Sequence, residues 1–342
     1  MSGKRVLGVV WLAILLLTLP GFLGAPGLLS SPLGSSSLQR SPISPTMPDD
    51  DEPVKLESNL VNIIFAVRDS QNQPVKDLSK HDVLVTHDGV PQPIAFFARR
   101  DELPLVLAIA IDFSGSQQWI WPESRAAVEQ FLSHVFRPGH DYVALASFRG
   151  TVHLHAALTN QRQRIDRLMP ALARTDTGYA RQGTALYDAI FVLTDEVLDG
   201  PTAWRIARNH HDMIQRALLV LTDGHDTASV HNATNAIARA QRAGVAVYAV
   251  GIGDAFGRAA VDHKALDHIC RETGGRAYYP KRFDDLRWAF RQIAEELTTQ
   301  YMLAFYWPTI RPDDGLIRVQ IVGRPNLSIR WRRGYEISSV PL

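Results

Sequence analysis

The middle of the chain, from about residue 103 to 297, alternates short uncharged apolar runs with longer segments of helical periodicity. Apolar runs of this length, bounded by turns, are typical of strands buried on both faces of a parallel sheet. Strands that alternate with helices form βαβ units, and repeated units build a doubly wound sheet. The clearest runs are LVLAIAI, DYVALASF, ALLVLTD and VAVYAVGI. We therefore predict an α/β domain with a mostly parallel, doubly wound sheet, Rossmann-like in architecture, over residues 101–298.

Both flanks of this domain show the two-residue period of strands instead. Residues 54–100 contain LVNIIFAVRD, DVLVTHDGV with an Asp88-Gly89 turn, and PIAFFAR; residues 299–342 contain YMLAFYW, a turn at 312–315, LIRVQIV and LSIRWRRGY. Neither segment is long enough to bury a core by itself. We therefore expect the N- and C-terminal β segments to pair into one small β-sandwich.

Residues 1–25 have the layout of a signal peptide. Lys4 and Arg5 precede an uncharged apolar stretch over residues 6–19. No clean small-residue cleavage site follows, so an uncleaved membrane anchor through residues 6–29 is the alternative. Residues 26–53 are rich in proline and serine and predict a disordered linker. We expect the folded part to be extracytoplasmic, whether secreted, periplasmic or anchored to a membrane by its N-terminus.

Composition excludes several classes of protein. The 36 Lys and Arg residues balance 35 Asp and Glu residues, and a net charge of +1 gives no field that would draw the chain onto nucleic acid. Cys270 is the single cysteine, which excludes an internal disulfide, an iron–sulfur cluster and a cysteine-rich zinc module. Its helical surroundings predict a small buried apolar side chain. The sequence has no P-loop and no Gly-x-Ser-x-Gly elbow.

Oxygen-bearing side chains stand in three loops of the predicted sheet. Asp112, Ser114 and Ser116 alternate in the turn after LVLAIAI, so all three can face one point; Thr184 stands at the entry of a helix, and Asp223 ends ALLVLTD. Ligands of doubly wound sheets bind at loops beyond the carboxyl ends of strands. Two carboxylates and three hydroxyls form a hard, all-oxygen set, which suits Mg²⁺ or Mn²⁺ better than zinc.

This pattern resembles the metal-ion-dependent adhesion site of the von Willebrand factor type A (VWA) family, which reads Asp-x-Ser-x-Ser, then Thr, then Asp. The resemblance covers roughly residues 103–297 and fills all five positions. It implies that the hydroxyls ligate Mg²⁺ directly or nearly so, that the aspartates contact it directly or through water, and that a partner's carboxylate completes the octahedron. The flanking β segments are similar to those of VWA-related proteins described from Acidobacteria, which informs architecture more than mechanism.

The resemblance implies a non-enzymatic binding module whose Mg²⁺ captures an acidic group of a partner protein. Two aspartates leave the ion without compensation from a third protein acid, which favours an incoming carboxylate. One alternative is a metal-assisted hydrolase, which would need a general base such as His225 or Asp226 beside the site. The other is a structural scaffold of a cell-envelope assembly, whose metal only stabilises the loops.

Other side chains give weaker signals. His210, His211 and His225 lack the spacing of a zinc site, and we expect exposed histidines, the first two on an insertion at 199–212. Trp119 and Trp121 either anchor a partner at the rim of the site or cover the edge of the sheet. The arginines of the last strands are expected on a solvated face; they are Arg318, Arg324, Arg330, Arg332 and Arg333.

Overall fold

The computed structural model describes residues 60–71, 73–115, 120–172, 183–211, 213–253, 260–306, 317–324 and 326–331. The chain divides into two compact units, residues 1–54 and 55–342, and all described residues belong to the second. The predicted signal peptide or anchor, the linker and the 312–315 turn lie outside the described residues, as do Ser116 and Trp119. None of the helices in the described part of the chain has the length and apolarity that a bilayer crossing requires.

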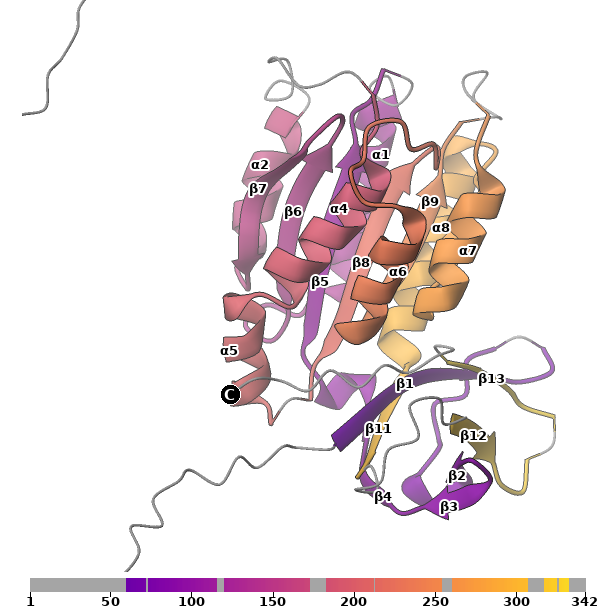
Figure 1. Ribbon diagram of the computed structural model, residues 1–342. Helices are drawn as coiled ribbons and strands as arrows, with labels where there is room; N and C mark the ends of the chain where they lie inside the picture. Colours follow the sequence, from indigo (N-terminus) through magenta and orange to yellow (C-terminus); the bar gives the residue numbers. More distant parts are fainter. Residues whose placement is uncertain are drawn as a thin grey trace, which may run out of the picture. The chain divides into compact units, whose positions relative to one another are not determined.

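A six-stranded sheet forms the centre of the α/β domain (Figure 1). Its strands are β10 (Ala277–Tyr278), β9 (Val245–Gly251), β8 (Gln215–Thr222), β5 (Leu105–Asp112), β6 (Tyr142–Phe148) and β7 (Val152–Thr159), given in their order across the sheet. All neighbours run parallel except β7, which is antiparallel to β6. Every residue of β5 is buried, because helices cover both faces. The predicted α/β fold is confirmed.

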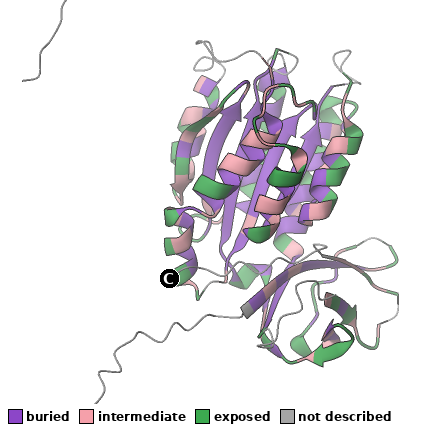
Figure 2. Cartoon of the chain, in the orientation of Figure 1, coloured by how far each residue is buried: buried purple, intermediate pink, exposed green. Residues whose placement is uncertain are grey.

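Helices pack on both faces of this sheet and turn their exposed sides outward (Figure 2). One face is covered by α1 (Trp121–Val135), α2 (Arg162–Leu168), η4 (Met169–Ala171) and α8 (Phe283–Thr299). The other is covered by α4 (Leu186–Val192), its continuation η5 (Leu193–Leu198), α5 (Pro201–Asn209), α6 (Ala233–Arg242) and α7 (His263–Thr273). The segment expected as an insertion is therefore largely α5, which buries Ala203, Ile206 and Ala207 in this second layer.

The two flanking segments pair with each other, as predicted. One small sheet has the order β13 (Ser328–Trp331), β1 (Leu60–Arg68), β11 (Tyr301–Tyr306) and β4 (Ile94–Arg99); the other has β12 (Ile317–Ile321), β2 (Val83–His87) and β3 (Val90–Gln92). Short 3-10 turns, η1 (Lys80–Asp82) and η2 (Arg100–Glu102), precede β2 and follow β4. Both sheets share one core that includes Phe65, Val85, Leu303 and Val319.

The Asp88-Gly89 turn joins β2 to β3, as predicted. Both residues have positive φ, 49° and 82°, which is the requirement of the two-residue hairpin turn that Asp-Gly favours. The turn therefore fixes the register in which Thr86 pairs with Pro91.

One expectation about the last strands is wrong. Arg330 does not lie on a solvated face: its guanidinium donates to the carbonyl oxygen of Gly275 at 2.7 Å and pairs with Glu296 of α8. Arg324 forms an ion pair with Asp77, and Arg318 is exposed. Arg332 and Arg333 lie outside the described residues. Glu296 is fully buried, and a buried carboxylate requires a cationic partner, which is why Arg330 is drawn inward.

Candidate metal centre

Asp112 is the last residue of β5, and its side chain is held by two neighbouring groups. Its carboxylate accepts hydrogen bonds from the backbone N–H of Ser114 and from the hydroxyl of Thr222, both at 2.8 Å. Thr222 ends β8, the strand next to β5. The carboxylate is therefore oriented at the carboxyl edge of the sheet, where ligand sites of doubly wound folds form.

The electrostatic surroundings of Asp112 favour a bound cation. Burial raises the pKa of this carboxyl to about 7 although Ser114 and Thr222 donate hydrogen bonds to it, and the negative charge of Asp223 raises the pKa further. In the part of the chain that the structure describes, no Lys or Arg side chain pairs with Asp112. A divalent cation would supply the countercharge and restore the ionised form.

Asp223 follows β8 directly and is 3% exposed. Its carboxylate accepts a hydrogen bond from the backbone N–H of His225 at 3.1 Å, and its backbone carbonyl accepts one from Asp262 at 2.8 Å. The next residue, Gly224, has a φ of +87°, and a Cβ there would lie 2.9 Å from Leu266. Glycine therefore lets the chain turn tightly against the start of α7 and leaves the Asp223 carboxylate at the sheet edge.

Thr184 reaches this edge from the loop before α4. The residue is 6% exposed. Its backbone N–H donates to the hydroxyl of Thr227 at 2.9 Å, and its carbonyl accepts from the backbone N–H groups of Thr227 and Ala228 at 2.9 and 3.0 Å. These bonds attach the Thr184 loop to the loop that carries Asp223.

The predicted ligands that the structure describes thus gather at the carboxyl edge of the six-stranded sheet. Asp112 and Asp223 end or follow neighbouring strands, Ser114 is 6% exposed beside Asp112, and Thr184 is bonded to the loop after Asp223. No group of three or more His, Cys, Asp or Glu side chains suited to a metal occurs among the described residues, so an ion here would need hydroxyl or water ligands in addition to the two aspartates. That donor set fits a hard cation such as Mg²⁺ or Mn²⁺, and assignment of the individual ligands stays a prediction.

The side chains with weaker sequence signals have separate positions. Trp121 is buried, and its ring packs against the ring of Phe113 with 5.3 Å between the ring centroids. It therefore covers the core beneath the site. His211 and His225 are exposed as expected, whereas His210 is only partly so. Cys270 is buried as predicted, and burial raises the pKa of its thiol.

The sequence reasoning missed several residues around the site. Thr222 stands at the end of an apolar run, directly before Asp223. A hydroxyl at the last position of a buried strand could have indicated a residue that contacts the site. Thr227 and Ser229 were also missed. They bond to the Thr184 loop and the start of α4 across more than 40 residues of sequence, and nothing in the local pattern indicates this pairing.

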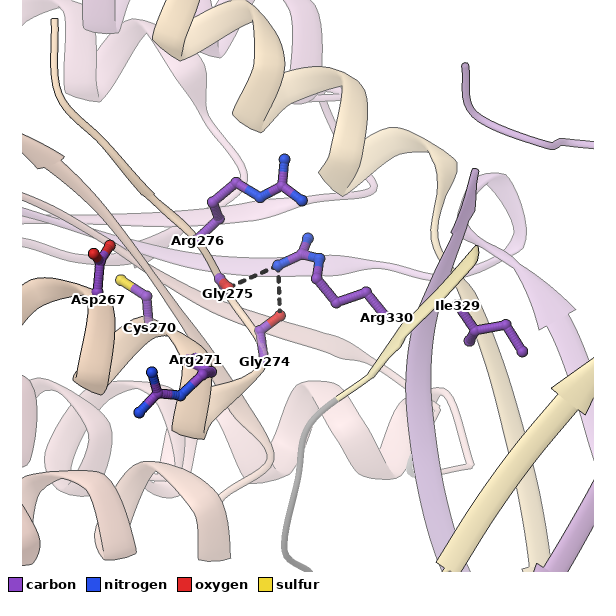
Figure 3. A pocket seen from close by; sticks show the side chains of 8 residues that line it. All are labelled: Asp267, Cys270, Arg271, Gly274, Gly275, Arg276, Ile329 and Arg330. Carbon is purple, nitrogen blue, oxygen red and sulfur yellow. Dashed lines mark hydrogen bonds between the residues drawn. The ribbon is translucent and has the colours of Figure 1, made fainter. Parts of the chain in front are cut away.

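A separate hollow of about 460 Å³ lies where β13 meets the end of α7 (Figure 3). Arg271, Arg276 and Arg330 line it together with the buried Cys270. Two of these arginines already have acidic partners: Arg330 pairs with Glu296, and Arg271 pairs with Glu272. The hollow lies at the opposite end of α7 from Asp262, the residue that contacts Asp223, so it is not part of the candidate metal centre.

Comparison with known proteins places this architecture in a family. A search of curated proteins finds no significant match. Similar solved structures include an aerotolerance-related membrane protein from Bacteroides fragilis (17% identity over 56% of this chain and 98% of that chain, TM-score 0.43). They also include a von Willebrand factor type A protein from Catenulispora acidiphila (13% identity over 80% of this chain and 73% of that chain, TM-score 0.46). A third is proximal thread matrix protein 1 from the mussel byssus, with zinc in its MIDAS motif (15% identity over 61% of this chain and 48% of that chain, TM-score 0.46). The sequence itself matches the von Willebrand factor type A domain over residues 107–292, more than half of its length, and the chain therefore belongs to the VWA family.

Proposed function

We propose that this VWA protein binds a partner protein outside the cytoplasm through a divalent cation, Mg²⁺ or Mn²⁺. The ion would be held by Asp112, Ser114, Ser116, Thr184 and Asp223, and a carboxylate of the partner would complete its coordination. The observation that carries the proposal is the buried Asp112 carboxylate, which has a second carboxylate nearby and no cationic side chain paired with it among the described residues. Such a pair of acids is costly without an ion between them.

The two candidate general bases of the hydrolase alternative, His225 and Asp226, both contact other residues. His225 directs its Nε2 at the carbonyl oxygen of Ala260 at 2.7 Å, so this nitrogen carries a proton and a base at this residue would have to be Nδ1. The Asp226 carboxylate accepts hydrogen bonds from the backbone N–H of Tyr187 and from the hydroxyl of Ser229. Both residues named as candidate general bases therefore also make structural contacts, and the hydrolase and the scaffold stay secondary proposals.

The extracytoplasmic location rests on the sequence of residues 1–53. The basic pair at Lys4 and Arg5, the apolar stretch and the Pro- and Ser-rich linker together support export, followed by release or tethering. The β unit formed by both flanks supports the finer proposal that the chain is of the type described from Acidobacteria.

The test is capture of a defined acidic ligand by the full-length chain. Immobilised peptides rich in Asp and Glu are compared with matched peptides rich in Asn and Gln, each in Mg²⁺ and in EDTA. We expect capture only by the acidic peptide in Mg²⁺, and loss of capture in Asp112→Ala. Capture that persists in EDTA would refute the proposal. A metal-dependent rise in melting temperature without capture would favour the scaffold, and metal-dependent turnover of an ester substrate would favour the hydrolase.

A further inference from the structure

The loop at residues 226–231, here called the clasp loop, binds the Thr184 loop through reciprocal backbone contacts. Thr227 contributes both its hydroxyl, which accepts from the Thr184 N–H, and its N–H, which donates to the Thr184 carbonyl. Ala228 donates a second N–H to the same carbonyl. Both backbone polar groups of Thr184 are therefore committed to the clasp loop.

Gly183 shows how closely the two loops approach. Its φ is +114°, and a Cβ at this position would lie 2.8 Å from the Thr227 hydroxyl oxygen and 3.1 Å from the Ala228 Cβ. Separations below 3.0 Å are not tolerated by real side chains. Only glycine permits this contact, so the backbone at Gly183 packs directly against the side chains of Thr227 and Ala228.

The clasp loop also caps α4, the helix that Thr184 precedes. The N-cap residue of α4 is Ala185, which has no side chain that could accept from the first turn. Asp226 accepts from the N–H of Tyr187 at 3.0 Å, and Ser229 accepts from the N–H of Asp188 at 2.9 Å. A negative carboxylate at a helix N-terminus is favourable because it faces the positive end of the helix dipole.

A return contact closes the arrangement from the helix side. The Asp188 carboxylate accepts from the backbone N–H groups of Val230 and His231 at 3.0 and 2.9 Å, and it contacts Nδ1 of His231 at 2.7 Å. The His231 ring stacks on Phe191 of the same helix at 3.8 Å. Each end of the clasp loop is thus fixed to α4, and Thr184 lies directly before this helix.

We propose that Thr227 and Asp226 are positioning residues of the metal centre: they hold Thr184 in register with Asp223, which lies four residues before Thr227. This inference rests on the proposed metal-binding function. A threonine hydroxyl is a neutral ligand, and its contribution to affinity depends on being held in place before the ion arrives. The clasp loop provides this hold with hydrogen bonds among the protein's own groups.

The test is Mn²⁺ affinity, measured by electron paramagnetic resonance on the full-length chain. Thr227→Val keeps the shape of the side chain and removes the acceptor of the Thr184 N–H, whereas Thr227→Ser retains it. We expect Thr227→Val to weaken Mn²⁺ binding by about 10-fold, as removal of outer-shell partners typically does, and Thr227→Ser to stay within about 2-fold of wild type. Asp226→Asn should weaken Mn²⁺ binding in the same direction. Thr234→Val, at an exposed position on α6, is the matched control and should leave affinity unchanged.

Two further measurements separate positioning from general stability and from the proposed function. Thr227 is exposed, so the melting temperature of apo Thr227→Val should stay near that of wild type, while hydrogen exchange of the Thr184 amide should accelerate. Wild-type affinity in Thr227→Val, or an equal loss in Thr227→Ser, overturns the positioning role alone. A wild-type chain that binds Mn²⁺ but captures no acidic peptide overturns the proposed function and leaves positioning supported. A wild-type chain that binds no Mn²⁺ overturns both.

Discussion

The hydroxyl group of Thr222 donates a hydrogen bond of 2.8 Å to a carboxylate oxygen of Asp112, and so joins the last residues of two neighbouring strands side chain to side chain. The same Thr222 oxygen accepts the N–H of Gly224 at 3.1 Å. One hydroxyl thus orients the first proposed carboxylate ligand and the turn that carries the second. The geometry of this edge is set by hydrogen bonds among the protein's own groups.

Asp112→Asn should stabilise the protein when metal is absent. The raised pKa of Asp112, about 7, means that charging this carboxyl opposes folding as pH rises from about 4 to 7. At pH 8 in EDTA we expect a higher free energy of unfolding for the variant, by about 1 to 3 kcal/mol, and near equality at pH 4. Urea unfolding at both pH values measures the difference. A variant less stable than wild type at pH 8 would contradict the expectation.

Mg²⁺ should offset that difference in stability. An ion that binds only the folded state raises the free energy of unfolding by about 2.7 kcal/mol when present at 100 times its dissociation constant. We expect this gain in wild type and its loss in Asp112→Asn, measured by urea unfolding in Mg²⁺ and in EDTA. Equal gains in both proteins would place the ion elsewhere.

Asp141 should be a determinant of acid stability away from the metal centre. It is fully buried, and although burial opposes ionisation, hydrogen bonds from Arg137 and the charge of Arg100 lower the pKa of its carboxyl. A lowered pKa contributes stability that is present above about pH 4 and lost as pH falls through the folded value. Asp141→Asn should cost about 3 to 5 kcal/mol at pH 7, because two arginines lose their partner, and this cost should shrink in acid. Thermal unfolding across pH 3–7 tests this, and a pH-independent difference would contradict it.

Arg330→Met should destabilise the protein by leaving the buried Glu296 without its cation. The expected cost is about 3 to 5 kcal/mol in urea unfolding. The double variant Arg330→Met/Glu296→Gln should recover much of the loss, because the new amide side chain would carry no charge and Tyr248 can still donate to its oxygen. Arg318→Met, on the exposed face of β12, is the control and should change stability by less than about 0.5 kcal/mol. Equal effects of Arg318→Met and Arg330→Met would refute the role of the buried pair.

Gly183→Ala should damage the metal edge more than a matched glycine change elsewhere. Gly139 also has a positive φ, +79°, but a Cβ there meets nothing within 4 Å, so Gly139→Ala gives the cost of a positive φ without a steric contact. We expect the loss of stability in Gly183→Ala to exceed the loss in Gly139→Ala by about 1 kcal/mol or more, since the new Cβ at Gly183 must also displace Thr227. Thermal unfolding measures the two costs, and similar values would show that the contact between the loops relaxes freely.

Much of the fold follows from local pattern. The run LVLAIAI predicts a strand buried on both faces, and β5 is buried throughout. Asp112 and Asp223 are predictable as neighbours in space because carboxyl ends of parallel strands share an edge. The Asp88-Gly89 turn follows from the positive φ that these residue types accept.

Other features depend on partners far along the chain, which periodicity does not encode. Arg330 alternates like a surface residue on its strand, but Glu296 on α8 draws it inward. Thr227 lies in a polar stretch that is typical of any surface loop, and only the fold brings it against Thr184. The segment at 199–212, expected as an insertion, is largely the helix α5, and the local sequence does not show that Ala203, Ile206 and Ala207 are buried in the second helical layer.

The interleaving of β11 between β1 and β4 has a consequence for the order of assembly. Leu60 pairs with Tyr306 and Arg99 pairs with Tyr301, so the β unit cannot close until chain separated by about 200 residues or more has been made and brought together. Folding of the α/β domain brings the ends of that long loop to adjacent positions and removes most of its closure entropy. We therefore expect the α/β domain to act as the template and the β unit to be the last part to fold, so that a newly made chain would expose the edges of β1 and β4 until β11 pairs with them.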